Sequence, residues 1–338
     1  MPKLLEVREL VTHFFTRDGV VRAVDGVSFS LDPGQTLAVV GESGSGKSVT
    51  ALSLMRLVAE PAGRIVSGEA LYNGVDILKM SDSQVREFRG DRMAMIFQDP
   101  MTSLNPVYKV GRQVGETLMI HKGMSRKDSI KRAIELLEMV GIPNARERAG
   151  NYPHQFSGGM RQRAMIAMAL ACDPDILIAD EPTTALDVTI QAQILELMTE
   201  MQRRTGAAII MITHDLGVVA DVADEVMVMY AGKQVEYGKA AEVFYRPKHP
   251  YTWGLLDSIP RHDVSEKDAL LPITGHPPSL INVPPGCAFH PRCPYAADLC
   301  RTQVPSLSDC GNGHLAACHF AGADEFIRGV DPAKWKAA

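Results

Sequence analysis

The chain has 338 residues, of which 46% are hydrophobic and 22% charged, and its formal net charge is −5. This length predicts a core domain with an appended part, and the mildly acidic charge gives no electrostatic case for nucleic-acid binding. No stretch approaches the ~20 apolar residues that span a bilayer. The first residues, Met-Pro-Lys-Leu-Leu-Glu, lack the apolar core of a signal peptide. We therefore expect residence in the cytosol, where disulfides rarely persist.

The segment from Leu4 to Leu31 alternates apolar and polar residues, which predicts antiparallel strands. Turn signals lie within this segment at Arg17-Asp-Gly19 and directly after it at Asp32-Pro-Gly34. Phe14 and Phe15 precede the first turn, and we place Phe14 in a short loop after the first strand.

The segment Gly41-Glu-Ser-Gly-Ser-Gly-Lys-Ser48 fits G-x-x-x-x-G-K-[ST], the loop that wraps the phosphates of a nucleotide. An apolar run at 36–40 predicts a buried strand before the loop, and residues 49–56 have helical spacing. Glycines let backbone N–H groups turn toward phosphate oxygens, and the helix N-terminus adds a partial positive charge. Lys47 would reach the β- and γ-phosphates, and the Ser48 hydroxyl would bind Mg²⁺. The predicted nucleotide contacts in this region are Gly41, Glu42, Ser43, Gly44, Ser45, Gly46, Lys47, Ser48 and Val49.

The middle of the chain alternates strands and helices around a helical insertion, which predicts a mostly parallel α/β core. Helical patterns occupy about residues 110–171, including helices at 129–140 and 159–171. Apolar runs at 93–97 and 207–213 predict strands, the first of which ends at Gln98.

Another apolar strand, Ile176-Leu-Ile-Ala, ends in two adjacent carboxylates, Asp180 and Glu181. Asp180 can hold Mg²⁺, directly or through water, and Glu181 can orient and deprotonate an attacking water. Three more motifs accompany these acids: Phe156-Ser-Gly-Gly-Met160, which offers backbone donors at a helix start, Thr184-Ala-Leu-Asp187, and His214-Asp215 at a strand end. Taken alone, Gln98 could be a polar cap and His214 a structural histidine.

In this order, the motifs make residues 4–245 resemble the ABC ATPase family. The resemblance implies an α/β nucleotide-binding domain that combines a P-loop core sheet, an antiparallel β subdomain and a helical subdomain at about 99–170. In that family Glu181 would be the catalytic base, His214 would contact the γ-phosphate, and Gln98 would contribute to catalysis and to Mg²⁺. Phe14 would stack on adenine, with packing in the core as the alternative. The motif reads FSGGM where the family has LSGGQ, and we expect this departure to tune the nucleotide contacts only slightly. The motif residues that would contact the nucleotide of a partner subunit are Ser157, Gly158 and Gly159.

Five of the 6 cysteines lie near the end of the chain, in the order Cys287-x5-Cys293-x6-Cys300, then Cys310 and Cys318. A disulfide framework conflicts with a cytosolic ATPase. Four thiolates suit a structural zinc or a [4Fe–4S] cluster, although the spacing does not fit the C-x2–4-C knuckles of typical zinc sites. Inert or regulatory thiols are the remaining alternative.

Three segments of this tail look like the C-terminal extension of oligopeptide and dipeptide permease ATPases: His249-Pro-Tyr251, Pro284-Pro-Gly-Cys287 and Pro291-Arg-Cys-Pro294. We therefore divide the chain into an ATPase domain, 1–246, and an extension, 247–338. In the permease group the extension carries a [4Fe–4S] cluster, so zinc becomes the less favoured metal. We expect a mainly structural cluster, whose loss would loosen residues from about 285 to 320 and leave nucleotide binding intact. Carried over by position, the ligands would be Cys287, Cys293, Cys300 and Cys318, with Cys310 able to replace Cys318.

The resemblance implies the ATP-hydrolysing subunit of an ABC importer for oligopeptides, peripheral on the cytoplasmic face of the cell membrane. It would pair head to tail with a homologous ATPase, as a heterodimer, beneath two transmembrane permease subunits. An extracytoplasmic peptide-binding protein would deliver peptides to these subunits. Coupling helices of the permeases would dock on the helical insertion near Gln98. A dipeptide or nickel importer is the alternative of the same class. A non-transport ABC ATPase acting on DNA or ribosomes is the alternative of another class, and a tail that senses iron or oxygen would be an added role.

Overall fold

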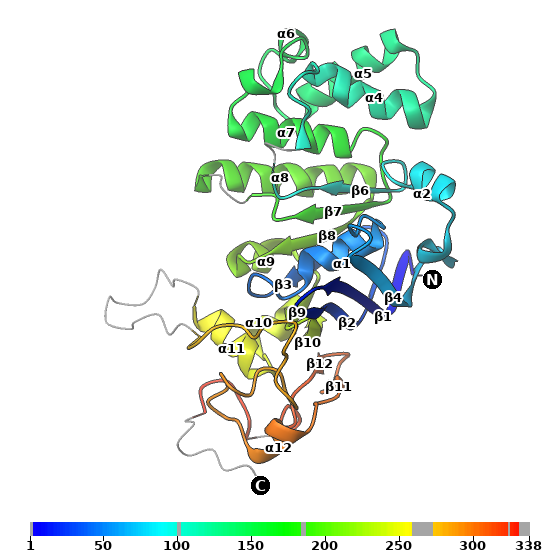
Figure 1. The fold of residues 1–338 in the computed structure, drawn as a ribbon. Coiled ribbons are helices and arrows are strands. Elements are labelled where there is room, and N and C mark those ends of the chain that lie inside the picture. Colours follow the sequence, from blue (N-terminus) through cyan, green and yellow to red (C-terminus); the bar gives the residue numbers. More distant parts are fainter. Residues whose placement is uncertain (1–2, 100–102, 184–186, 259–272, 324, 331–338) are drawn as a thin grey trace. The chain divides into compact units, whose positions relative to one another are not determined.

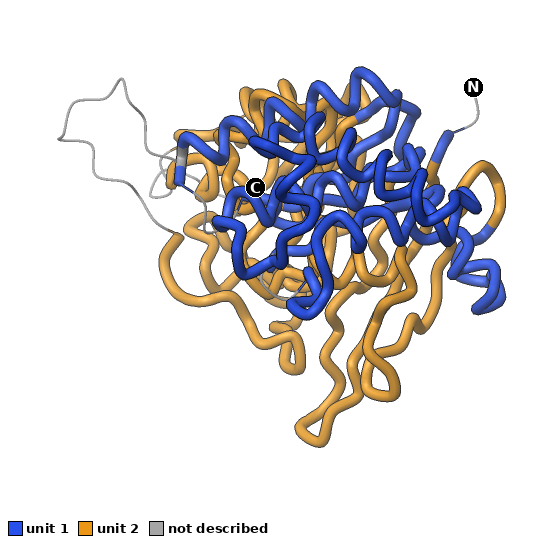
Figure 2. Tube along the Cα trace, turned by 90° about the horizontal axis from the view of Figure 1, so that it is seen from above, with its two compact units in different colours: residues 1–4, 31–35, 76–212 blue, residues 5–30, 36–75, 213–338 orange. Residues whose placement is uncertain are grey.

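The computed structural model describes residues 3–99, 103–183, 187–258, 273–323 and 325–330. The chain divides into two compact units, which Figure 2 shows in different colours. Unit 1 comprises residues 1–4, 31–35 and 76–212, and unit 2 comprises residues 5–30, 36–75 and 213–338. None of the helices in the described ranges combines the length and the apolar character that crossing a bilayer requires.

Unit 1 contains a parallel sheet whose central strand carries the paired carboxylates. Strand β7 (Ile176–Asp180) pairs in parallel with β6 (Met93–Ile96) and with β8 (Ala208–Thr213). Every residue of β7 and β8 is buried, which is typical of parallel strands that are covered on both faces. Because the strands are parallel, their carboxyl ends lie at one edge of the sheet, and β7 ends there at Asp180.

The predicted helical insertion is also present in unit 1, where α4, α5 and α7 pack against one another (Figure 1). The Ser125 hydroxyl accepts a hydrogen bond from the Asp128 backbone, so α5 starts at Arg126, one turn before the predicted start. Gly123 adopts φ 62 and ends α4. The helices whose bounds the structure describes in unit 1 are η1 (Ile77–Lys79), α2 (Asp82–Phe88), α4 (Val110–Lys122), α5 (Arg126–Met139), α6 (Ala145–Arg148), η2 (Pro153–Gln155), α7 (Gly158–Ala169) and α8 (Val188–Thr205).

Unit 2 contains the antiparallel strands that the first segment predicts. In one sheet, β1 (Leu5–Thr16) lies between β2 (Gly19–Leu31) and β4 (Gly63–Tyr72), with β5 (Val75–Asp76) beyond β4. The loop predicted at Phe14 is wrong, because Phe14 pairs with Gly63 and the backbone ladder continues with Phe15 N–H donating to the Ala62 carbonyl at 2.8 Å. Phe14 is therefore a half-buried strand residue.

The other strands of unit 2 join the predicted nucleotide-binding part to the cysteine-rich extension. Strand β3 (Thr36–Val40) is parallel to β9 (Glu225–Tyr230), and β10 (Lys233–Lys239) is antiparallel to β9. From the extension, β12 (Leu315–Ala316) pairs with β10, and β11 (Ser308–Asp309) pairs with β12. The helices of unit 2 are α1 (Lys47–Leu54), α9 (Leu216–Val222), α10 (Ala240–Tyr245), α11 (Pro250–Asp257) and α12 (Asp298–Thr302).

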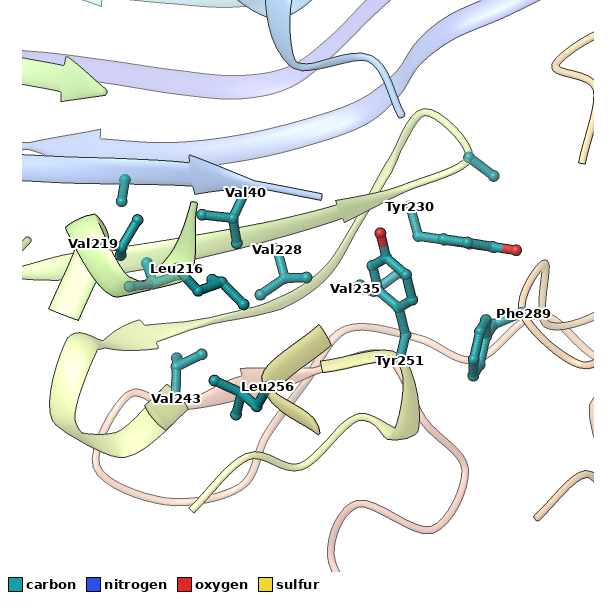
Figure 3. Packing of buried hydrophobic residues seen from close by; sticks show 13 residues of the cluster. Val40, Leu216, Val219, Val228, Tyr230, Val235, Val243, Tyr251, Leu256 and Phe289 are labelled. Atoms are coloured by element: carbon teal, nitrogen blue, oxygen red, sulfur yellow. The ribbon is translucent and has the colours of Figure 1, made fainter. Parts of the chain in front are cut away.

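A buried cluster fixes the extension to strands β3 and β9 (Figure 3). Its aromatic centre consists of Tyr230 at the end of β9, Tyr251 in α11 and Phe289 in the extension. Their ring centroids lie 4.6 Å apart for Tyr230 and Tyr251, and 5.3 Å apart for Tyr230 and Phe289, distances at which aromatic pairs attract. The extension thus shares its core with the strands that flank the phosphate loop.

Candidate functional site

The predicted phosphate loop lies in unit 2 between the buried strand β3 and helix α1, which confirms its strand–loop–helix frame. Gly41 and Gly46 have φ of +148 and +107, and a Cβ there would lie 2.3 Å from the Met229 carbonyl oxygen and 2.2 Å from that of Ala23, respectively. Gly44 has φ +77, and a Cβ there would meet nothing within 4 Å. Two glycines are therefore needed for tight packing, and the third needs a left-handed backbone beside open space.

Lys47 and Ser45 give this loop its polar character. The Lys47 side chain is buried, and its Nζ donates to the carbonyl oxygens of Gly41 at 2.7 Å and of Glu42 at 2.9 Å. The Ser45 Oγ is also buried, yet it has no hydrogen-bond partner among the residues described. A buried ammonium group and an unsatisfied hydroxyl in one loop fit a ligand rich in anionic oxygens, such as the phosphates of a nucleotide.

The predicted catalytic carboxylate lies in unit 1, hydrogen-bonded to the predicted glutamine. Gln98 follows β6, and its Nε2 donates to Glu181 Oε2 at 2.8 Å. Glu181 follows β7 with φ 47, and its backbone N–H donates to the Ile212 carbonyl at 2.9 Å. A non-glycine residue in this region is uncommon, and such strained residues cluster at active sites. The structure thus brings Gln98, Asp180 and Glu181 together at the end of β7, where a carboxylate and an amide can orient a water molecule.

The predicted signature residues form the start of helix α7 in unit 1. The Ser157 hydroxyl caps the helix by accepting from the Met160 backbone N–H at 3.3 Å. Ser157 and Gly158 are exposed, and a Cβ at Gly158 would meet nothing within 4 Å. Open space around a capped helix start leaves room for an anion to approach the backbone N–H groups.

His214 and Phe14, both in unit 2, complete the predicted nucleotide contacts. His214 is exposed directly after β8, and the next residue, Asp215, caps helix α9 with its side chain. The phosphate loop, Phe14 and His214 therefore belong to unit 2, whereas Gln98, Asp180, Glu181 and the signature residues belong to unit 1. Their meeting on one nucleotide and the stacking of Phe14 on adenine stay predictions.

Four cysteines line one small cavity in the extension: Cys287, Cys293, Cys300 and Cys318. Cys310 is not among its lining residues. Burial raises the pKa of Cys293 and of Cys318 to about 12, so each thiol stays protonated unless a cation compensates its charge. The four cysteines around this cavity are the set that the resemblance predicts.

The arrangement of these cysteines bears on which metal they could hold. Within the described ranges, no group of three or more His, Cys, Asp or Glu side chains is placed to hold one metal ion. Four thiolates are the usual ligand set of a structural zinc ion and of a [4Fe–4S] cluster alike.

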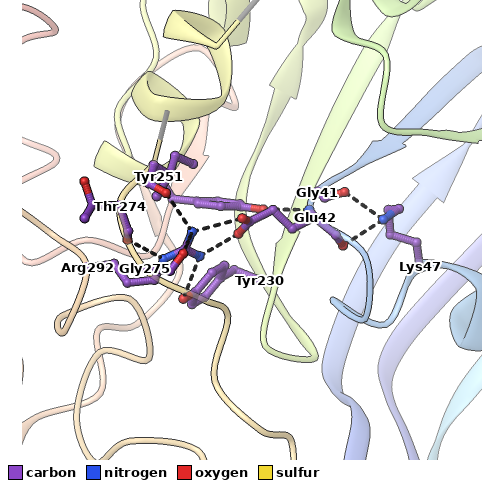
Figure 4. Close-up of polar contacts among 9 residues, drawn as sticks. Gly41, Glu42, Lys47, Tyr230, Tyr251, Thr274, Gly275 and Arg292 are labelled. Carbon is purple, nitrogen blue, oxygen red and sulfur yellow. Dashed lines mark hydrogen bonds and ion pairs between the residues drawn. The ribbon is translucent and has the colours of Figure 1, made fainter. Parts of the chain in front are cut away.

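Two residues of the extension that sequence reasoning did not assign to the site contact the phosphate loop (Figure 4). Arg292 Nη1 lies 2.6 Å from Glu42 Oε2, and Arg292 Nη2 lies 2.9 Å from Glu42 Oε1. The Glu42 backbone N–H donates to the Tyr251 hydroxyl at 2.8 Å. Both residues occur in motifs of the tail, but no sequence spacing signals a contact across 250 positions.

Comparisons with known proteins agree with both parts of the chain. Residues 24–184 match the ABC transporter family, and residues 235–300 match the family described as the oligopeptide/dipeptide transporter C-terminal region. The oligopeptide transport ATP-binding protein OppD of Salmonella typhimurium is 55% identical over 324 residues, which cover 96% of this chain and 95% of that protein. The chain belongs to the ABC transporter ATP-binding subunits of the oligopeptide/dipeptide group.

Further relatives confirm the predicted fold class of this ABC ATPase. The dipeptide transport ATP-binding protein DppD of Bacillus subtilis is 54% identical over 318 residues, covering 94% of this chain and 95% of that protein. A dimeric structure of a post-hydrolysis state of the ATP-binding cassette MJ0796, bound to ADP and Pi, is similar with a TM-score of 0.63 and 26% identity. The structural similarity covers 70% of this chain and 98% of the cassette.

Proposed function

We propose that this ABC ATPase hydrolyses ATP to drive the uptake of oligopeptides across the cytoplasmic membrane. The observation that carries the proposal is the joining of an intact Gln98–Glu181 pair to an extension of the oligopeptide/dipeptide type in one chain. The identity to the Salmonella oligopeptide transport protein, 55% over nearly the whole length, supports oligopeptides as the substrate. The comparable identity to the Bacillus dipeptide transport protein, 54%, keeps dipeptides as the second candidate.

In this proposal each residue has a role that its environment supports. Lys47 exchanges two loop carbonyls for the β- and γ-phosphates of ATP, to which a full charge binds more strongly. The Ser48 hydroxyl and the Asp180 carboxylate would hold Mg²⁺, which would supply positive charge to neutralise the charge that develops on the phosphates. Glu181 accepts a proton from the attacking water, and Gln98 keeps the Glu181 carboxylate in position through their hydrogen bond. His214 contacts the γ-phosphate.

The proposed partners are a second, homologous ATPase subunit, two transmembrane permease subunits and an extracytoplasmic peptide-binding protein. The exposed start of α7 supports a head-to-tail pair in which Ser157, Gly158 and Gly159 serve the partner's nucleotide. This assembly places the chain as a peripheral subunit on the cytoplasmic face of the membrane.

A groove on the helical part of unit 1 supports docking of the permease subunits. It has a volume of about 710 Å³, and it is lined by residues of the α4, α5 and α6 regions. Val107, Tyr108 and Tyr152 at this groove are exposed, and Arg112 lies 4.2 Å from the centroid of the Tyr108 ring. Exposed aromatic and aliphatic side chains next to arginines are typical of sites where proteins bind a partner helix.

We also propose a [4Fe–4S] cluster in the extension, with Cys287, Cys293, Cys300 and Cys318 as ligands and zinc as the less favoured alternative. A cluster supplies four bonds between segments that contain little regular structure, and so it holds the extension together. The proposed role of the cluster is therefore structural.

Reconstitution of the complex in proteoliposomes tests the function. ATP inside the vesicles should drive uptake of labelled peptides that the binding protein delivers, and mass spectrometry of peptides copurifying with the binding protein should identify oligopeptides. Exclusive recovery and uptake of dipeptides would select the second candidate. ATP hydrolysis without any peptide uptake would contradict the importer assignment.

A further inference from the structure

Arg292 connects the cysteine-rich extension to the phosphate loop through a bidentate ion pair with Glu42. The Arg292 side chain is 5% exposed and the Glu42 side chain 27% exposed, so the pair is partly withdrawn from water. Both residues belong to unit 2, and Figure 4 shows the guanidinium group facing the carboxylate. Bidentate pairs of this kind are stronger and more directional than single hydrogen bonds, particularly away from solvent.

Two carbonyls of the extension and one hydroxyl of β9 hold the Arg292 guanidinium group in place besides Glu42. Arg292 Nε donates to the Thr274 carbonyl at 3.1 Å, and Nη2 donates to the Gly275 carbonyl at 3.2 Å. The Tyr230 hydroxyl lies 3.4 Å from Nη1. The hydrogen bond to Glu42 raises the pKa of Arg292 above its already high usual value, so the guanidinium group is charged at every pH of interest. Arg292 is therefore a preorganised, permanently charged anchor.

Glu42 is fixed at three points, and one of them involves the lysine that would bind ATP. The Glu42 carboxylate contacts Arg292, and the Glu42 backbone N–H donates to the Tyr251 hydroxyl. Burial raises the pKa of Tyr251 far above its usual value, so this hydroxyl stays neutral. The Glu42 carbonyl accepts from Lys47 Nζ at 2.9 Å. Holding Glu42 therefore holds both the start of the phosphate loop and the resting place of Lys47.

We propose that Arg292 is a positioning residue for the phosphate loop, and that the C-terminal extension sets the ATP affinity of this chain through the Arg292–Glu42 pair. Arg292 acts through Glu42 and does not touch the nucleotide. A loop that is already ordered loses less conformational entropy when ATP binds, so it binds more tightly. The inference rests on the ATP-binding role proposed above and is independent of the transported substrate.

Equilibrium titration of the full-length chain with a non-hydrolysable ATP analogue and Mg²⁺ tests this role. Arg292→Ala should weaken binding roughly tenfold, because the loss of a charge-assisted hydrogen bond shifts an equilibrium constant by about that factor. Glu42→Gln keeps the shape of the side chain but removes its charge, and it should weaken binding in the same direction. Arg328→Ala is the matched control, because Arg328 forms its ion pair at 2.6 Å with Asp257 rather than with the loop. The control should bind the analogue like the wild type.

A double-mutant cycle separates this role from a general loss of structure. The double variant Arg292→Ala/Glu42→Ala should bind the analogue no more weakly than the weaker of its two single variants, because both remove one interaction. In the assembled transporter, Arg292→Ala should raise KM for ATP more than it lowers kcat, whereas partial unfolding would lower kcat through the active fraction. Should Arg292→Ala fail to fold, as judged by thermal unfolding, Glu42→Gln decides the question alone.

Two results would overturn the inference: wild-type affinity for the analogue in a folded Arg292→Ala or Glu42→Gln chain, or fully additive losses in the cycle. Because the titration uses the chain without permeases or peptide, a transporter that fails to import oligopeptides would leave the inference untouched. Failure of the wild-type chain itself to bind the analogue would instead refute the ATPase assignment.

Discussion

The phosphate loop and the C-terminal extension differ in how their sequences encode their contacts. The loop is contained in the consecutive residues Gly41–Ser48, and its neighbours β3 and α1 directly adjoin it. The extension instead builds its contacts from distant segments, for example by placing Arg292 on Glu42 and Phe289 on Tyr230. The local motif identifies the residues that would bind phosphate, whereas the long-range contacts determine which other residues hold the loop in place. Substitutions that perturb each region separately show whether the phosphate loop and the extension depend on one another.

The largest expected effect comes from Glu181→Gln, which keeps the side-chain shape and removes the proposed base. We expect ATP turnover at this site to fall roughly 10²- to 10⁴-fold, the usual contribution of a general base, while ATP binding is kept. Turnover should be followed at this single site, because the partner ATPase can mask part of the loss. Near wild-type hydrolysis at this site would show that another group is the base.

The next largest effect is expected for Lys47→Ala, which removes the side-chain cation of the phosphate loop. A charge-assisted hydrogen bond is worth about 1.5–3 kcal/mol, so ATP affinity should fall roughly 10- to 150-fold. Equilibrium titration with Mg²⁺ and ATP measures the loss. Unchanged affinity would mean that the loop does not hold the phosphates.

A smaller effect on the loop is expected from the extension. Anaerobically purified protein should contain about four iron and four sulfide per chain, and Cys293→Ser should remove them. Sequence reasoning alone expects nucleotide binding to survive this loss. Because Arg292 adjoins Cys293, the structure predicts instead that ATP affinity falls by a factor of about 3 to 10, which corresponds to weakening one contact by the worth of an ordinary hydrogen bond.

Cys310→Ser is the control for that experiment, because Cys310 does not line the cavity that the other four cysteines share. It should keep both the iron and the ATP affinity. Stoichiometric zinc without iron in the wild type would refute the cluster. Unaltered ATP affinity in an iron-free Cys293→Ser chain would show that the phosphate loop does not depend on the metal site of the extension.

The smallest effect concerns pH. Burial lowers the pKa of His249 from 6.5 to about 3, and its Nδ1 accepts a hydrogen bond from the Tyr251 backbone N–H. Between these values the unfolded chain binds a proton that the folded chain does not, so the free energy of unfolding falls as pH falls below about 6.5, by at most about 1.4 kcal/mol per pH unit. His249→Asn retains an acceptor and does not titrate. Denaturant unfolding from about pH 7.5 to 5.5 should show the wild type losing more stability than this variant, and parallel curves would contradict the prediction.

Local patterns predicted much of the fold and of the candidate site. The glycines, Lys47, and the acids at the end of β7 were predictable because strand–loop–helix frames and strand ends place such residues by short-range geometry. The loop predicted at Phe14 was wrong, because pairing of β1 with β4 extends the strand to Thr16. The Arg292–Glu42 contact was not predictable, since packing of Phe289 and Tyr251 on β9 brings these residues together and no sequence spacing records it.

Amide hydrogen exchange of the full-length chain tests most directly whether the extension and the phosphate loop depend on one another. We expect Arg292→Ala to speed exchange both in the loop, at Glu42 to Lys47, and in the segment Ile273 to Gly275 that holds the guanidinium group, because each loses a shared anchor. Arg328→Ala should leave exchange in the loop unchanged. Faster exchange confined to the extension in Arg292→Ala, with the loop exchanging as in the wild type, would show that the phosphate loop does not depend on the extension.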